Sequence, residues 1–220
     1  YRKAFHTVVP VAPPPRFEDA PDGWRWQLLA DMAQLESGHT PSRHRPDWWG
    51  GDTSWISLTE IRALDGQWVD STQLRTNAEG IANSSARILP RGTVCYSRTA
   101  SVGFVCIMAA PMATSQDFAN WICGDGLDAE FLMHALIRSR EELRELATGA
   151  THKTIYMPQL KSFHLCAPDI DEQRHFVQRL QSQLTDAAAI AQAAAAQLAE
   201  IERLPQKLLA QAFAPQGDVT

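Results

Sequence analysis

The most regular pattern in the chain is a seven-residue repeat of apolar side chains between residues 171 and 213. Such a repeat gathers its apolar residues into one stripe along a helix and is typical of helices that pack against a second helix. We therefore predict a long helix with this stripe as its interface. The first position holds Val177, Leu184, Ala191, Leu198 and Ala212, and the fourth holds Leu180, Ala187, Ala194, Ile201 and Leu208.

Proline interrupts this repeat once, at Pro205, which occupies a first position. Because proline lacks a backbone N–H and clashes with the preceding turn, we expect a kink or a restart there. The uninterrupted part, residues 171–204, would be about 50 Å long. The stripe could instead lie on the helix's own domain. We favour a partner helix, because a straight stripe of this length overhangs a domain of this size.

Short runs rich in β-branched and aromatic residues occur before the helix, separated by clusters of Gly, Pro, Asp and Ser. Residues 53–58, 93–96 and 102–107 are predicted strands. One helix is predicted after Asp128, an N-cap residue followed by apolar residues at helical spacing as far as Leu146. The fold class is therefore α+β, with a mixed globular domain over 23–168 and the long helix over 169–213.

The two ends of the chain lack periodic patterns. Residues 8–21 contain five prolines, which stiffen a segment into an extended linker, so residues 1–22 are predicted to be a tether. Residues 214–220 form a short tail. The chain begins with Tyr1 rather than Met, and we expect it to be processed, trimmed or part of a longer protein.

Composition narrows the class of protein. The 220 residues are 45% hydrophobic and 20% charged, which excludes a disordered or fibrous chain. The longest apolar run, residues 104–113, is too short to cross a bilayer, so no membrane is expected. Four widely spaced cysteines fit neither a zinc site nor a disulfide framework and favour the cytoplasm. The net charge of −5 gives no basic tail, so any DNA binding must come from local arrangements.

Motifs for autonomous catalysis are missing. A common metal-dependent nuclease needs an acidic residue two positions before a lysine, and the four lysines follow Tyr, Thr, Gln and Pro at that spacing. A methyltransferase nucleotide loop, a Gly-x-Ser-x-Gly elbow and a P-loop are also missing. We predict no catalytic residue and no metal site in this chain.

Three loops carry groups that recognise DNA. Residues 40–45 offer hydroxyls and two arginines, and 16 of the 20 basic residues are arginine, which suits planar bidentate contacts. Residues 97–101 and 148–154 are further exposed loops with similar chemistry. The alternative is that all three are solvated loops, and Trp48 and Trp49 could stack on bases or pack internally. The candidate DNA-binding residues are Thr40, Ser42, Arg43, His44, Arg45, Arg98, Thr99, Thr151, His152 and Lys153.

Eight short motifs occur in order along nearly the whole chain, in residues 23–28, 37–43, 51–56, 89–94, 97–103, 113–118, 149–155 and 171–174. Together they resemble the specificity subunit of type I restriction-modification systems. One departure is the segment before the long helix, which keeps only Pro168 of the usual proline-rich run.

The resemblance implies a target recognition domain followed by a conserved spacer helix. A typical member has two of each, and the two helices pack antiparallel to set the distance between two half-sites of double-stranded DNA. Partner modification subunits carry S-adenosylmethionine and methylate adenine, and a restriction subunit can join them; no cofactor is expected in this chain. With one domain and one helix, the chain would be a half-length subunit that forms a homodimer, or the second, C-terminal half of a longer subunit, paired with another specificity half.

Two other functions remain open at this stage. The chain could be a coiled-coil adaptor whose loops do not read DNA. It could also be the specificity fragment of a fused methyltransferase-nuclease. The helix supports the specificity-subunit interpretation, because about 50 Å corresponds to roughly 15 base pairs and suits a ruler between half-sites.

Overall fold

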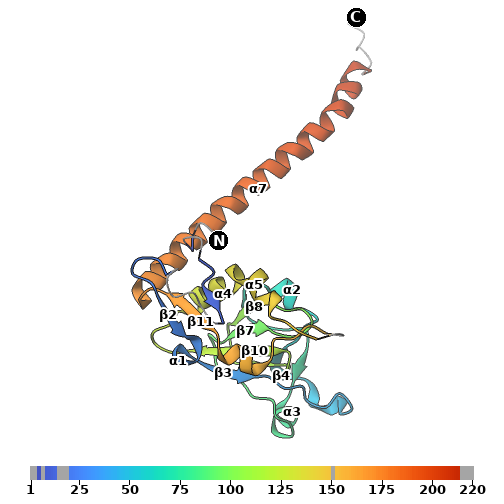
Figure 1. Ribbon diagram of the computed structural model, residues 1–220. Coiled ribbons are helices and arrows are strands. Elements are labelled where there is room, and N and C mark those ends of the chain that lie inside the picture. The colour runs from blue at the N-terminus through green and yellow to red at the C-terminus, as the bar shows by residue number, and fades with distance from the viewer. Residues whose placement is uncertain (1–3, 6–7, 14–19, 150–151, 214–220) are drawn as a thin grey trace, which may run out of the picture. The chain divides into compact units, whose positions relative to one another are not determined.

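The computed structural model describes residues 4–5, 8–13, 20–149 and 152–213 (Figure 1). The chain divides into a globular unit, residues 1–177, and a helical unit, residues 178–220. The globular unit combines three β-sheets with short helices, and the α+β prediction is confirmed. The boundary lies after the predicted position at residue 168, because the first turns of the long helix belong to the globular unit.

A five-stranded sheet forms the centre of the globular unit, with the strand order β3-β10-β7-β8-β5. All neighbours pair antiparallel except β5 and β8, which are parallel. The predicted strands at 93–96 and 102–107 correspond to β7 and β8. The bounds are β3 (Ala33–Ser37), β10 (Phe118–Cys123), β7 (Val94–Ser97), β8 (Val105–Met108) and β5 (Trp68–Val69).

Two three-stranded sheets complete the β-structure. The first has the order β1-β11-β2, and the second has the order β6-β4-β9 and contains the predicted strand at 53–58. The bounds are β1 (Val11–Ala12), β11 (His164–Ala167) and β2 (Arg25–Leu28), followed by β6 (Arg75–Thr76), β4 (Trp49–Ile56) and β9 (Ala113–Thr114).

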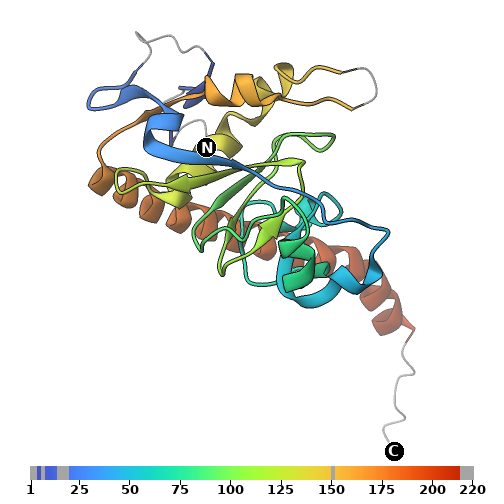
Figure 2. The ribbon, with the colours of Figure 1, turned by 90° about the horizontal axis from the view of Figure 1, so that it is seen from below.

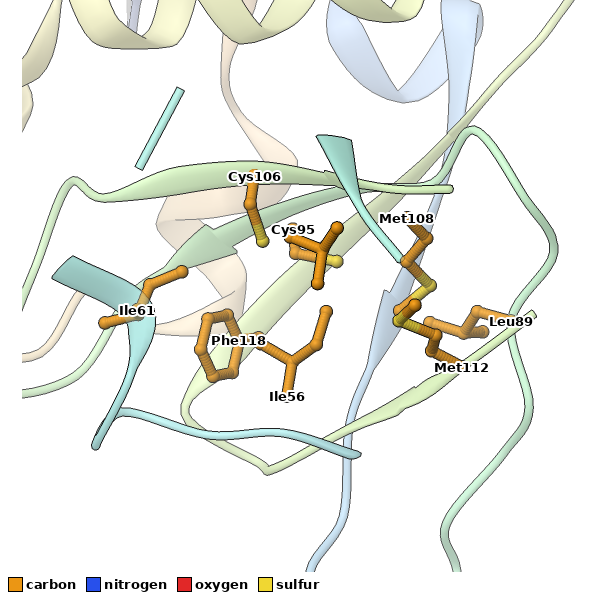
Figure 3. Close-up of a cluster of buried hydrophobic side chains, with 9 residues drawn as sticks. Ile56, Ile61, Leu89, Cys95, Cys106, Met108, Met112 and Phe118 are labelled. Carbon is orange, nitrogen blue, oxygen red and sulfur yellow. The ribbon is translucent and has the colours of Figure 1, made fainter. Parts of the chain in front are cut away.

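Apolar residues from these sheets meet in a buried cluster, shown in Figure 3. Ile56 of β4 and Phe118 of β10 face Cys95 and Cys106, which are cross-strand partners in β7 and β8. All four side chains are fully buried. This cluster fixes β4 against the central sheet and thereby sets the positions of the loops that flank it.

The short helices connect the strands, and one of them corrects a prediction. Asp128 caps α4 as predicted, since its Oδ1 accepts the N–H of Phe131 at 3.0 Å. The predicted single helix is interrupted at Ser139, whose hydroxyl accepts the N–H of Val11 at 2.9 Å. The helices are α1 (Leu29–Met32), the 3-10 helix η2 (Pro46–Trp48), α2 (Ile61–Leu64), α3 (Ala78–Ala82), α4 (Ala129–Arg138), α5 (Arg140–Glu145) and α6 (Met157–Lys161).

The described part of the proline-rich segment packs on the globular unit, contrary to the predicted tether. β1 pairs with β11, and the Pro10 carbonyl accepts the N–H of Cys166 at 2.8 Å. Phe5 is fully buried and lies 4.5 Å from Phe176, ring centre to ring centre. The prolines allow an edge strand, because an edge strand leaves one side of its backbone without ladder hydrogen bonds.

The long helix, α7 (Ile170–Ala212), is continuous through Pro205. The helix does not restart at Pro205, so this part of the prediction is wrong. Proline removes one backbone hydrogen bond, and in an exposed helix water can satisfy the carbonyl that loses its donor.

Candidate nucleic-acid interface

The first candidate loop, between β3 and β4, is fixed to the last residue of β9. The N–H of His39 donates to the Thr114 carbonyl at 2.9 Å. At Gly38 a Cβ atom would lie 2.1 Å from the Ser115 carbonyl oxygen, so the close approach requires glycine. The start of this loop therefore has a defined position on the rigid sheet.

Arg43 lies over a pair of tryptophans. Its guanidinium is 4.1 Å from the ring centre of Trp49 and 5.0 Å from that of Trp55. The two rings pack edge to face with centres 5.0 Å apart, and Trp55 is buried. No described residue accepts a hydrogen bond from this guanidinium, and the side chain is exposed. Arg43 therefore presents an oriented donor fork to an incoming ligand.

Arg45 has a different environment. Its Nε and Nη2 donate to the two carboxylate oxygens of Asp47 at 3.0 and 2.7 Å. This hydrogen-bonded pair raises the pKa of Arg45 and lowers that of Asp47. The guanidinium also lies 4.8 Å from the ring centre of Trp48. The Nε–Nη2 edge of the guanidinium is therefore already bound to a carboxylate within the loop.

The hydroxyls of the first loop are partly used inside the protein. The Ser42 hydroxyl accepts the backbone N–H of His44, and the Ser42 carbonyl accepts the indole N–H of Trp49 at 3.2 Å. The Thr40 hydroxyl donates to the side-chain carbonyl of Gln116. His44 is exposed. Thr40, Ser42 and Trp48 line a pocket of about 550 Å³ together with residues 82–85, which the sequence analysis did not single out.

The second and third candidate loops form one structure. Thr99 pairs with Thr154 in an isolated β-bridge, and the N–H of Ala100 donates to the Lys153 carbonyl at 2.9 Å. Thr148 and Thr154 close the third loop with two backbone hydrogen bonds, at 3.0 and 2.8 Å. His152 and Lys153 are exposed, and Thr151 lies outside the described residues.

Arg98 is built into the fold to a greater extent than the sequence suggested. Its Nη2 donates to the Gln116 carbonyl at 2.7 Å, and its Nη1 donates to the Ile155 carbonyl at 3.5 Å. Burial lowers its pKa. These contacts support the loops around Arg98 and leave fewer of its donors for DNA.

Gln116 joins the first candidate loop to the second, and Arg98 extends this connection to the end of the third. Its side chain accepts from Thr40, and its backbone carbonyl accepts from Arg98, which also reaches Ile155 after the third loop. This role of Gln116 was not predicted from the sequence, although the residue stands within one of the motifs that carry the resemblance.

The predicted interface stripe of α7 divides between the two units. Val177 is 5% exposed within the globular unit, and Leu180 is 3% exposed. From Leu184 to Leu208 the remaining stripe residues are exposed; they are Leu184, Ala187, Ala191, Ala194, Leu198, Ile201 and Leu208. Ile190 and Leu204, adjacent to the stripe, are also exposed. The exposed apolar surface is therefore wider than the two heptad positions alone.

The described part of the chain contains no group of three or more His, Cys, Asp or Glu side chains placed to hold a metal ion. Among the described helices, none combines the length and the apolar character that a membrane span requires.

Comparison with known proteins identifies the family of this chain. The family model described as the type I restriction modification DNA specificity domain matches residues 21–203, which is most of the chain. The chain belongs to this family. The match covers the loops described above and most of α7, and it confirms the resemblance.

Two specificity subunits and one solved structure illustrate the relationship. The chain is 27% identical over 157 residues to the type I restriction enzyme MjaIX specificity subunit of Methanocaldococcus jannaschii, covering 70% of this chain. It is 28% identical over 133 residues to the HindI specificity subunit of Haemophilus influenzae, covering 60% of this chain. The crystal structure of the HsdS subunit from Thermoanaerobacter tengcongensis superposes with a TM-score of 0.71 at 22% identity, covering 97% of this chain.

The chain spans only part of these specificity subunits. It covers 36% of the MjaIX subunit, 28% of the HindI subunit and 50% of the HsdS chain. One globular unit and one long helix therefore match about half of the solved subunit.

Proposed function

We propose that this chain is the non-catalytic DNA-recognition component of a type I restriction-modification complex. The globular unit reads one half-site of a bipartite target in double-stranded DNA. The connection of the three loops carries the proposal: Gln116 joins the first loop to the second, and the bond from Ala100 to the Lys153 carbonyl joins the second to the third. These contacts hold an oriented arginine, hydroxyls and an exposed lysine on one scaffold.

The exposed stripe of α7 supports a pairing role. It pairs with the corresponding helix of a second copy, or of another specificity half, and thereby fixes the distance between half-sites. The 43 residues of α7 span about 64 Å, which corresponds to roughly 19 base pairs.

Methyl transfer belongs to the partners in this proposal. Modification subunits carry S-adenosylmethionine and modify the DNA that this chain selects, and a restriction subunit joins them in a restricting complex. The four cysteines are free thiols, which supports a reducing cytoplasm as the place of action.

Selection from a random duplex pool tests the proposal. The chain is assembled with its modification subunit, and the retained DNA is sequenced. A split motif with a fixed gap is expected, and a palindromic split motif would mean two identical globular units related by a dimer axis. No enrichment by a complex shown to be assembled would contradict DNA recognition and favour a coiled-coil adaptor.

A further inference from the structure

A second basic site lies beside the three loops, around the ring of Phe104. It is a pocket of about 390 Å³ whose lining includes Arg62 of α2, Arg144 of α5 and Lys153 of the 148–154 hairpin. Among the described residues, none that lines this pocket is acidic. We call it the Phe104 pocket.

Three guanidinium groups surround the Phe104 ring. Those of Arg62, Arg140 and Arg144 lie 5.5, 5.1 and 5.5 Å from its centre. The negative face of an aromatic ring attracts each cation, but cations gathered around one ring also repel each other. An anion in the pocket would relieve this repulsion.

The fixed ion pairs neutralise only part of this charge. Arg140 is held by both carboxylate oxygens of Asp65 at 2.7 Å, and Arg144 pairs with Glu141 at 2.8 Å. Arg62 and Lys153 are exposed and have no acidic partner within the described part of the chain. The pocket therefore keeps two cations available for a ligand.

The loop that supports the pocket is rigid. Ser97 binds both ends of residues 101–104, since its hydroxyl donates to the Ser101 carbonyl and accepts the N–H of Phe104 at 2.9 Å. Gly103 has a φ of +97°, and a Cβ atom there would lie 2.8 Å from Arg140 Cγ. Glycine thus allows the arginines to approach, and the Val102 carbonyl fixes Arg144 through its Nε at 2.9 Å. A preorganised site loses little conformational entropy when it binds.

We propose that the Phe104 pocket binds a phosphate group of the DNA backbone and anchors the duplex without reading its sequence. This inference rests on the proposed function. DNA is favoured as the ligand because the pocket is continuous with the candidate interface: Lys153 belongs to the third loop, and Ala100 lines the pocket while bonding to the Lys153 carbonyl. Cationic contacts of this kind supply affinity that does not depend on sequence and falls with salt.

Arg62 is the residue to vary, because it is exposed and its removal leaves the fold's hydrogen bonds intact. In the assembled complex, the plot of log affinity against log salt has a negative slope, and Arg62→Ala should make this slope shallower by about 0.9. At about 0.1 M salt this corresponds to a roughly eightfold loss of affinity. The loss should be equal for cognate and scrambled duplexes, and Arg62→Lys should restore most of the affinity.

Arg25→Ala is the matched control, since it removes an exposed arginine from β2, which lies on the other side of the globular unit from α2 (Figures 1 and 2). It should leave the salt slope unchanged. Phosphate ethylation interference gives an independent readout: Arg62→Ala should abolish interference at one phosphate and preserve it elsewhere.

The outcomes separate this inference from the proposed function. If Arg62→Ala leaves both the slope and the footprint unchanged while the complex still selects a split motif, the pocket inference is wrong and the proposed function stands. Failure of Arg62→Ala to assemble with the modification subunit would assign the pocket to an acidic protein partner. A complex of the unaltered chain that binds no duplex would overturn both.

Discussion

Arg43 and Arg45 lie two residues apart in one loop, yet they differ in the hydrogen bonds they can still form. The guanidinium of Arg43 rests on two tryptophan rings, and its donors have no acceptor among the described residues. That of Arg45 already donates two hydrogen bonds to Asp47. Both were predicted from the sequence as DNA contacts. The hydrogen bonds between Arg45 and Asp47 depend on side-chain conformation, which the sequence does not reveal.

This difference predicts unequal effects of alanine substitution on DNA binding. Arg43→Ala should cost about 1 to 3 kcal/mol of binding free energy in the assembled complex. If Arg43 contacts a base, specificity should relax at one position; if it contacts a phosphate, all sequences should weaken equally. Arg45→Ala should have a smaller effect. Fluorescence anisotropy with cognate and scrambled duplexes measures both variants, and a larger loss for Arg45→Ala would contradict this assignment.

His134 predicts a pH dependence of stability. It is 4% exposed in α4, and burial lowers its pKa from 6.5 to about 4. Below pH 6.5 the unfolded chain takes up a proton that the folded chain does not, so the free energy of unfolding falls as the pH drops. The loss is about 1.4 kcal/mol per pH unit and approaches roughly 3 kcal/mol near pH 4, where it levels off.

Urea unfolding of the unaltered chain and of His134→Gln between pH 7 and 4.5 measures this contribution. The variant should be less stable at pH 7, since its amide replaces a packed ring, but its stability should decline less steeply below pH 6.5. Parallel curves for the two proteins would mean that His134 does not titrate with the depressed pKa.

At the scale of elements, the sequence predicted those strands and helix ends that depend on neighbouring residues in the chain. The strands β7 and β8 follow from their apolar runs, and the start of α4 follows from the Asp128 cap. The break between α4 and α5 could not be predicted, because Ser139 bonds to Val11, 128 residues away. The connection between loops through Gln116 could not be predicted either, since Arg98 donates to the backbone carbonyl of Gln116, a group that every residue carries.

The exposed stripe of α7 predicts that a charge introduced into it prevents oligomerisation. Leu198 is 57% exposed in the middle of the stripe. Leu198→Asp would place a charge in the proposed helix pair, where no partner compensates its lost hydration, and should therefore abolish pairing. Sedimentation velocity over a range of concentrations measures the effect.

Ala196→Asp is the control for this prediction. Ala196 lies two residues before Leu198, on the face of α7 opposite the stripe. Both substitutions put aspartate into the helix at similar cost in propensity, so only the disruption of the interface should distinguish them. Equal association of Leu198→Asp and the unaltered chain would show that the stripe is not the interface.

At the scale of the whole molecule, the net charge does not favour the proposed binding of DNA. The chain carries 25 acidic and 20 basic residues, so its average field repels DNA. In the proposed function, recognition therefore relies on local cations, such as Arg43 in the first loop and Arg62 and Lys153 at the Phe104 pocket. A few such contacts release few counterions, and most of the phosphate neutralisation must come from partner subunits.

This charge distribution predicts that the isolated chain binds DNA weakly and with a shallow salt dependence. Its Kd at physiological salt should fall in the non-specific range of about 10⁻⁴ to 10⁻⁶ M. Addition of the modification subunit should tighten binding to roughly 10⁻⁸ M or below and steepen the slope of log affinity against log salt, because new cations then contact the backbone. Anisotropy titrations from 50 to 200 mM salt, with and without the partner, measure both quantities. An isolated chain that matches the assembled complex in affinity and in slope would mean that its own loops supply the phosphate contacts, despite the net charge of −5.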